Sequence, residues 1–565
     1  MRLHTVVQPS LRLPRSQQRP RASHIFVKQL NGHIRGIATN IAPDFDHLFR
    51  YDAGRWLWDE ETRLRERYKR FNVPELQNAA AEKVGAKKCV SISKLAEGGP
   101  NRVFRLVMDN GASVIARIPR PVSQVQSRMM ASEVATMDLA RTILDIPVPK
   151  VLGWQGDAEN PVQSEYMLME EAFGVPLFTI WDDMSIYQKE AIVDEVIGIE
   201  KKLLSLSFSR YGNLYHAEDA CPKCESFKVA GSLPQQLKED VERRFVIGPV
   251  VDEDFWKDER ARMDIDRGPW TRPEDYLKAI AHREIAWLSQ HAGLAPRRAE
   301  KQLLPRKFED DPRVHIGLYR KFEAVVDGML PRNRDILRST LWHFDLGAAN
   351  LFVQDGKISS VIDWQGAWAG PLLFQARHPR LVSYAGELTL SVPEEYEPME
   401  DEDEKAAVRT KIERSIIVVE YQEKTARENP TLDEAFKTPC GKVLQQTVAH
   451  ASNTWDEDLI ALRQCLIRVV RYWDEINGEI PCAIEMTAEE MQANADGAED
   501  WNAVADLWDT LSGIVQRDGW VSHENYEGAC EVFALFKKIG LEHFEGEQRE
   551  DFERITRWVA EKDLP

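Results

Sequence analysis

The residues whose types and spacing could do chemistry lie in one short segment, His343-Phe-Asp-Leu-Gly-Ala-Ala-Asn350. A second carboxylate, Asp363, follows thirteen residues after Asn350, at the end of an apolar run. Asp345 could accept the proton of a hydroxyl nucleophile or orient that hydroxyl. The side-chain oxygens of Asn350 and Asp363 are hard ligands, which suit Mg2+ rather than soft metals. Together these groups predict phosphoryl transfer from ATP to a hydroxyl.

The spacing H-x-D-x-x-x-x-N is that of the catalytic loop of protein-kinase-like phosphotransferases. Residues 351–353, Asp355-Gly356 and 358–362 follow it, and a tight Asp-Gly turn between two apolar runs predicts a β-hairpin. Such a hairpin would bring Asn350 and Asp363 together. Three fixed residues also occur at this spacing by chance, but the hairpin that ends in Asp363 favours the functional interpretation. We expect His343 to pack and to hold the loop, without a role in proton transfer.

A small sheet is predicted upstream of this loop, with strands at residues 90–95, 103–108 and 113–118. The first turn contains Gly98 and Gly99, which would let the backbone approach phosphates. The second turn is Asn110-Gly111, a strong hairpin signal. Strand, flexible turn, strand, turn, strand is the order in which the small lobe of a kinase begins.

The next element is a predicted helix at residues 131–144, with Glu133 in its first turn. In kinases a basic residue on the third strand pairs with a Glu of the following helix and contacts the α- and β-phosphates. Arg117 and Glu133 are the candidates for this pair. The alternative is an ordinary surface salt bridge.

A mainly helical lobe is predicted after an apolar strand at residues 166–169. Glu170 follows this strand, where the hinge that meets the adenine would lie, and its assignment rests on position alone. Helical periodicity begins at residues 186–206. The acidic run 394–404 is expected to be a solvated loop or linker, and the apolar stripe at residues 501–511 is expected to be core. The predicted fold class is α+β, a bilobal protein-kinase-like fold with a small antiparallel β-sheet lobe and a larger, mainly helical lobe.

Length and composition describe an ordinary globular chain of 565 residues with 43% hydrophobic and 29% charged residues. No apolar run approaches the length of about 18 residues that a membrane-spanning helix needs. Seven scattered cysteines argue against a disulfide framework and for a reducing compartment. The close pair Cys221-Pro-Lys-Cys224 has no second pair, so we expect ordinary loop thiols rather than a zinc site.

The net charge of −19 argues against a nucleic-acid partner. Residues 1–40 are the exception, because they contain seven Lys or Arg, several Ser and no Asp or Glu. An Arg-rich segment without acidic residues is typical of a mitochondrial transit peptide and lacks the apolar core of a secretory signal. The alternative is a disordered basic tail.

The chain resembles the aminoglycoside phosphotransferase family of protein-kinase-like enzymes, in particular a fungal mitochondrial branch of it. The resemblance covers about residues 55–545 and rests on His343–Asn350, Ile362-Asp363-Trp364, Lys94-Leu-Ala-Glu-Gly-Gly99, Val114-Ile-Ala-Arg-Ile-Pro119, Ala131-Ser-Glu-Val-Ala-Thr-Met137 and Ile146-Pro-Val-Pro149. It implies ATP and Mg2+ as cofactors and a hydroxyl of a small molecule as acceptor. It brings no established substrate for this branch, and no partner protein is implied.

One residue departs from the family pattern. Arg117 stands where members usually have Lys, and the two are not interchangeable, since Arg is bulkier and planar. This leaves open an alternative, a catalytically weak or inactive kinase-like protein that binds nucleotide or a partner as a mitochondrial scaffold. The expected organisation is a transit peptide at 1–40, an N-terminal helical extension at 41–88, the small lobe at 89–172, the helical lobe at 173–545 and a tail at 546–565.

Overall fold

The computed structural model describes residues 45–560, with gaps at 100, 121–124, 294–302, 306–307 and 395. The predicted transit peptide lies outside the described residues. The chain divides into two compact units, and the larger one comprises Phe71–Glu300 and Lys307–Ala498. The smaller one comprises the described parts of Met1–Arg70, Lys301–Arg306 and Glu499–Pro565. No helix of the described residues is long and apolar enough to cross a membrane.

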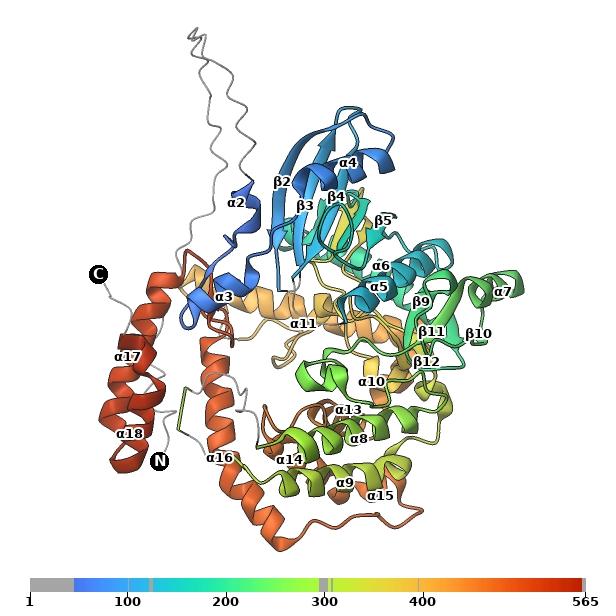
Figure 1. Ribbon diagram of the computed structural model, residues 1–565. Coiled ribbons are helices and arrows are strands. Elements are labelled where there is room, and N and C mark those ends of the chain that lie inside the picture. Colours follow the sequence, from blue (N-terminus) through green and yellow to red (C-terminus); the bar gives the residue numbers. More distant parts are fainter. Residues whose placement is uncertain are drawn as a thin grey trace, which may run out of the picture. The chain divides into compact units, whose positions relative to one another are not determined.

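The larger unit contains a five-stranded antiparallel sheet in the order β2-β3-β4-β6-β5 (Figure 1). The strands are β2 (Cys89–Glu97), β3 (Asn101–Met108), β4 (Ser113–Pro119), β5 (Val151–Gln155) and β6 (Tyr166–Glu170). They confirm the strands predicted at 90–95, 103–108, 113–118 and 166–169. Val103 of β3 pairs with Arg117 of β4, so Arg117 lies in the middle of the sheet.

Helix α5 (Gln126–Thr142) begins five residues before its predicted start, and Glu133 therefore lies in its interior. The prediction that Glu133 occupies the first turn is wrong. The first turn of α5 is polar, and the helix is buried on almost all sides from Met130 to Ala140. An apolar stripe could not mark the start of such a helix.

The rest of the larger unit combines helices with short sheets, and strands of two of these sheets flank residues 343–350. Its helices are α6 (Ile186–Leu204), α7 (Gln235–Arg244), α8 (Pro273–His291), α9 (Pro312–Met329), α10 (Leu372–Gln375), α11 (Glu402–Glu428), α12 (Pro430–Lys437), α13 (Gly441–His450), α14 (Leu459–Arg471) and α15 (Trp473–Asn477). The short strands include β7 (Val175–Pro176), β8 (Leu206–Phe208), β9 (Asn213–His216), β10 (Val229–Gly231), β11 (Phe245–Gly248), β12 (Ser339–Leu341), β13 (Leu351–Gln354), β14 (Lys357–Val361) and β15 (Ala369–Pro371).

Two sequence predictions in this part need correction. The helix predicted at 186–206 ends at Leu204, because Leu206 starts β8. The acidic run 394–404 is not a loop throughout, since Glu402, Asp403 and Glu404 form the first turn of α11. The Asp401 side chain accepts a hydrogen bond of 2.8 Å from the backbone N–H of Asp403, and carboxylates near a helix N-terminus are favourable.

A buried carboxyl joins α6 to α11. Glu200 is fully buried, and the Tyr421 hydroxyl lies 3.0 Å from both of its oxygens. Burial raises the pKa of Glu200 to about 8, from 4.5. The carboxyl is therefore protonated in the folded state up to about pH 8, whereas it ionises near pH 4.5 in the unfolded chain.

The pH dependence of stability should reflect this carboxyl. The protonated carboxyl contributes to the free energy of unfolding fully below pH 4.5, and this contribution is lost as the pH rises to about 8. Through this carboxyl, the free energy of unfolding of the wild type should fall by an amount on the order of 3 kcal/mol between pH 5 and pH 8. Glu200→Gln should lack this fall. Urea unfolding of both proteins at the two pH values measures it. An equal loss in wild type and variant would show that Glu200 does not titrate in this range.

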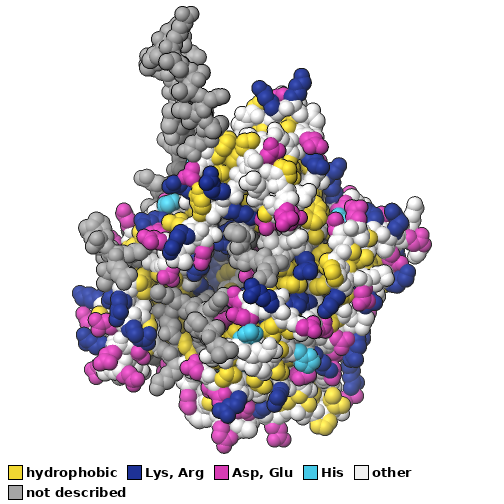
Figure 2. All heavy atoms as spheres, in the orientation of Figure 1, with side chains coloured by type: hydrophobic (Ala, Val, Ile, Leu, Met, Phe, Trp, Pro, Cys, Tyr) yellow, Lys and Arg dark blue, Asp and Glu magenta, His cyan; other side chains and the backbone are white. Residues whose placement is uncertain are grey.

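The smaller unit joins the two ends of the described chain. Strand β1 (Arg55–Trp56) pairs antiparallel with β16 (Trp520–Val521). The helices are α2 (Asp46–Phe49), α3 (Glu60–Arg67), the last part of α16 (Ala488–Leu511), α17 (Tyr526–His543) and α18 (Gly546–Ile555). Trp508 and Leu511 are buried in this core, as predicted for the stripe at 501–511. Figure 2 shows Lys and Arg interspersed with Asp and Glu on the visible face of the molecule.

Candidate active site

His343 holds the conformation of the segment 343–350. It follows the buried strand β12. The His343 Nε2–H donates to the carbonyl of Ile362 over 3.0 Å, and Nδ1 accepts from the Asp345 backbone N–H over 3.2 Å. Its ring packs edge-on against Trp364. Burial lowers the pKa of His343, so the ring is neutral, as these two bonds require. His343 holds the loop to the strand that leads to Asp363.

Asn350 links the loop to the hairpin. Its side-chain Nδ2 donates to the Asp345 backbone oxygen over 2.9 Å and to Asp345 Oδ2 over 3.0 Å. Both amide hydrogens are thereby used, and Oδ1 is the side-chain atom with lone pairs left to accept a bond. The Ile362 N–H donates to the Asn350 carbonyl over 3.0 Å. Strands β13 and β14 form the predicted antiparallel hairpin, so Asn350 and Asp363 lie at its open end.

Asp363 has an unusual backbone and an unusual side-chain environment. Its φ of 64° lies in the left-handed region, which costs a non-glycine residue on the order of 1 kcal/mol. Burial raises the pKa of its carboxyl, Arg117 opposes this effect, and Asp345 adds to it. Asp363 thus interacts with both charged groups of the predicted site. Although these surroundings are dense, Asp363 keeps contact with solvent, and a carboxyl beside a second carboxyl is an environment that a hard cation would stabilise.

Arg117 and Glu133 form the predicted pair. Arg117 Nη1 donates to Glu133 Oε1 over 2.7 Å, and Nη2 contacts Oε2. Their side chains are 12% and 2% exposed. Burial works against the charge of Arg117, but Glu133 and then Asp363 raise its pKa. The buried Arg117 Nε has no hydrogen-bond partner in the described residues.

The remaining predicted nucleotide residues lie at strand ends of the small sheet, just after β2 and at the end of β6. Gly98 and Gly99 are exposed, and the space around each would admit a side chain. The Glu170 side chain accepts from the Lys150 backbone N–H over 3.0 Å and lies 3.4 Å from Arg141. The nucleotide roles of Gly98, Gly99 and Glu170 remain predictions.

Two contacts of this site were not predicted from the sequence. Arg380 Nη1 lies 3.4 Å from Asp345 Oδ1, and its side chain is 77% exposed. Asn101, which follows the glycine turn, donates to Gln365 Oε1 over 2.8 Å. Both contacts join residues far apart in the sequence, and no local spacing signals them.

A cavity of about 390 Å³ opens beside Asp363. Its wall includes Met129, Asn213, Val250, Val251, Asp252, Glu253, Tyr276, Phe344, Gln365, Gly366 and Trp368. A second cavity, of about 220 Å³, shares Asp252, Tyr276, Phe344 and Trp368 with the first. Phe344 is the sequence neighbour of Asp345, so this space is next to the predicted catalytic carboxylate.

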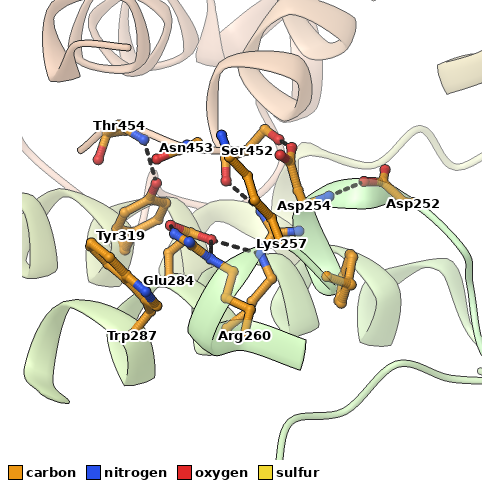
Figure 3. Close-up of polar contacts among 12 residues, drawn as sticks. Asp252, Asp254, Lys257, Arg260, Glu284, Trp287, Tyr319, Ser452, Asn453 and Thr454 are labelled. Carbon is orange, nitrogen blue, oxygen red and sulfur yellow. Dashed lines mark hydrogen bonds and ion pairs between the residues drawn. The ribbon is translucent and has the colours of Figure 1, made fainter. Parts of the chain in front are cut away.

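Figure 3 shows polar contacts among residues of the segment that begins at Asp252, of α8 and of the turn at residues 452–454. Asp254 accepts a hydrogen bond from the Ser452 hydroxyl, and Arg260 pairs with Glu284 through bonds of 3.0 and 2.6 Å. Asp252 keeps contact with solvent, yet its dense surroundings raise the pKa of its carboxyl, and Asp254 adds to this. The wall therefore presents a carboxylate and aromatic rings to a small molecule.

Comparison with known proteins identifies the family. The model of the phosphotransferase enzyme family matches residues 91–375, which include every predicted site residue. The chain belongs to the phosphotransferase enzyme family. This membership confirms the predicted α+β kinase-like fold.

Relatives of this phosphotransferase-family chain are fungal. A subtelomeric hrmA-associated cluster protein of Aspergillus fumigatus is 31% identical over 78% of this chain and 91% of its own. Altered inheritance of mitochondria protein 9, mitochondrial, of Yarrowia lipolytica is 26% identical over 86% of each chain, and that of Saccharomyces cerevisiae is 22% identical over 76% of this chain and 79% of its own. These names agree with the predicted mitochondrial location. A thermostable mutant of an aminoglycoside phosphotransferase, solved with ADP and hygromycin B, matches 71% of this chain and 98% of its own at 14% identity, with a TM-score of 0.34.

Proposed function

We propose that the protein is a mitochondrial phosphotransferase that uses ATP and Mg2+ to phosphorylate a hydroxyl of a small molecule. The observation that carries the proposal is the convergence of Asp345, Asn350 and Asp363 with Arg117. Asn350 bonds Asp345 directly, and Asp363 interacts with both Asp345 and Arg117. A scaffold without catalysis would have no need of all four.

Each residue would have a distinct task. Asp345 would orient the acceptor hydroxyl and accept its proton as the hydroxyl oxygen bonds to the γ-phosphorus of ATP, while the bond from that phosphorus to the β–γ bridging oxygen breaks and ADP leaves. Asn350 Oδ1 and a carboxylate oxygen of Asp363 would hold Mg2+, which would supply positive charge to neutralise the phosphates. Arg117, held by Glu133, contacts the phosphates that are not transferred. Catalysis then consists of positioning and charge stabilisation, with no covalent intermediate on the protein.

The acceptor would enter the cavity beside Asp363. Its volume of about 390 Å³ suits a small metabolite rather than a protein segment. Asn101 and Gln365 connect the glycine turn to the residues after Asp363, so the loop over the phosphates and the metal ligands would move together. Gly98 and Gly99 would let that loop approach the phosphates, and the backbone near Glu170 would meet the adenine.

The N-terminal segment 1–40 would direct import and be removed. Its basic, acid-free composition supports this role. Import into isolated mitochondria of a fusion that lacks residues 1–40 is the measurement, and undiminished import would refute it.

Nucleotide binding gives the first test of the function. We expect ATP to raise the melting temperature of the protein, and to raise it further with Mg2+, because a ligand of the native state stabilises it. Asp363→Asn should abolish the Mg2+-dependent part of the shift. Asp355→Asn is the matched control, since Asp355 is an exposed carboxylate on the same hairpin. No shift at millimolar ATP would contradict both an enzyme and a nucleotide-binding scaffold.

A further inference from the structure

The turn Cys221-Pro-Lys-Cys224 brings two thiols together outside the phosphotransfer site. The Cys224 backbone N–H donates to the Cys221 carbonyl over 3.1 Å, and Lys223 has a φ of 72°. Pro at the second position and a positive φ at the third make this a type II turn. The two sulfurs lie 3.2 Å apart. A disulfide bond is about 2.05 Å long, so a sulfur shift of about 1 Å would allow the bond to form.

The two thiols have different environments. The Cys224 thiol and the Arg128 guanidinium both stabilise a negative sulfur on Cys221, and they lower the pKa of Cys221. The pKa of Cys224 is raised, first by its bond to Cys221 and then by burial. Both side chains are partly exposed. Cys221 is thus suited to attack as a thiolate, while Cys224 holds its proton.

A metal site is a poorer explanation of this pair. Structural zinc takes four ligands, and Cys221 and Cys224 supply two. Within the described part of the chain, no group of three or more His, Cys, Asp or Glu side chains is arranged to hold a metal ion.

Cys224 packs against Gly248 at the end of β11, two residues before Val250 in the wall of the 390 Å³ cavity. A Cβ atom at Gly248 would lie 2.5 Å from Cys224 Sγ, so the sulfur sits directly against the last residue of β11. The chain continues from Gly248 to Val250 and Val251, which line the cavity. Val251 is held by a 2.9 Å bond from its N–H to Asn213 Oδ1.

A second connection runs through Arg128. This side chain lies over the Trp256 ring at 4.7 Å, and the Trp256 Nε1–H donates to the Val250 carbonyl over 2.7 Å. The next residue, Met129, lines the cavity, and its sulfur accepts from Gln365 Nε2 over 3.4 Å. Oxidation of Cys221 would remove the negative charge that interacts with Arg128, at the start of the helix that carries Glu133.

We propose that Cys221 and Cys224 are a thiol–disulfide site, whose oxidation by a low-molecular-weight disulfide displaces the wall of the cavity. The Cys221 thiolate attacks one sulfur of the external disulfide, and one thiolate leaves and takes up a proton. Cys224 then loses its proton and attacks the Cys221 sulfur, which expels the second thiol. Two electrons pass to the external disulfide, which becomes two thiols. This chemistry does not depend on the proposed phosphotransferase activity.

Oxidised glutathione tests the site in the full chain. We expect mass spectrometry after alkylation to find a Cys221–Cys224 disulfide in wild type and in the control Cys440→Ser. Cys224→Ser should accumulate glutathione on Cys221, whereas Cys221→Ser should form neither species. The alkylation rate of Cys221 should level off at a lower pH than that of Cys440, and Arg128→Met should raise that pH. A pair that stays reduced, or thiols that zinc protects until a chelator is added, would overturn the proposal.

Hydrogen exchange tests the effect on the cavity. We expect oxidation to change the exchange of peptides that contain residues 245–253 and 126–130 in wild type and in Cys440→Ser, and to leave Cys221→Ser unchanged. A disulfide that forms without any change in these peptides would refute the displacement of the cavity wall.

Discussion

Asp345→Asn should lower the kcat of phosphoryl transfer about 10²–10⁴-fold, the range that a positioned general base contributes. The Asn side chain retains an oxygen that can accept the bond from Asn350 Nδ2, so the loop should keep its shape. The substitution removes the charge that orients the hydroxyl and accepts its proton. MgATP binding should persist, because Asn350, Asp363 and Arg117 are unchanged. The loss is therefore expected in the chemical step and not in nucleotide affinity.

The measurement is transfer of labelled phosphate from ATP to metabolites of a mitochondrial extract, followed by kinetics on the phosphorylated compound. Asp355→Asn is the control for the same chemical change, and it should keep full activity. Asp355 has a φ of 52° in the hairpin turn, a conformation that Asn adopts readily. If wild type and Asp345→Asn yield equal products, the enzyme hypothesis is wrong, and the alternative of a kinase-like scaffold is favoured.

The second large effect is expected from Glu133→Ala, which leaves the buried Arg117 without its counter-charge. Removing one partner of a buried ion pair costs about 3–5 kcal/mol. The Arg117 side chain is 12% exposed, and its Nε has no hydrogen-bond partner in the described residues. Other than Glu133, the neighbour that raises its pKa is Asp363, the proposed metal ligand. The variant should therefore lose stability and, in addition, bind MgATP more weakly.

Chemical denaturation measures the loss, with Glu171→Ala as the matched control. Glu171 pairs with Arg105 over 3.0 Å on the same sheet, but these side chains are 36% and 45% exposed. An exposed pair contributes less than about 1 kcal/mol. If the two variants lose the same stability, the Arg117–Glu133 pair is an ordinary surface salt bridge. Arg117→Lys then tests nucleotide geometry, because Lys cannot form the two-bond contact.

Local signals in the sequence predicted a large part of the fold around the site. The Asn110-Gly111 turn predicted the β3–β4 hairpin, and the Asp355-Gly356 turn predicted the β13–β14 hairpin. Both could be predicted because a tight turn between alternating runs determines a hairpin without distant contacts. The second hairpin also places Asn350 and Asp363 at its open end, as the sequence predicted.

Contacts made by folding could not be predicted in this way. Arg380 reaches Asp345 from another part of the helical lobe, and Asp252 enters the cavity wall from the loop after β11. The start of α5 was missed because its packing against several elements hides the periodicity of a helix with one apolar face. Packing between residues far apart in the sequence determines the positions of these side chains and of the start of α5. No local pattern in a single sequence indicates such packing.

The pairing of β1 with β16 has a consequence for the order of events after synthesis. Because synthesis starts at the N-terminus, Trp56 of β1 is made early. Its partner strand, Trp520–Val521, is made near the end of synthesis. Until then the first strand has an open edge, and edges of this kind bind chaperones or other chains. A premature stop before residue 499 would leave residues 343–350 intact but β1 permanently without its partner strand. Truncated alleles should consequently be removed by quality-control proteases even though each residue of the proposed chemistry is present.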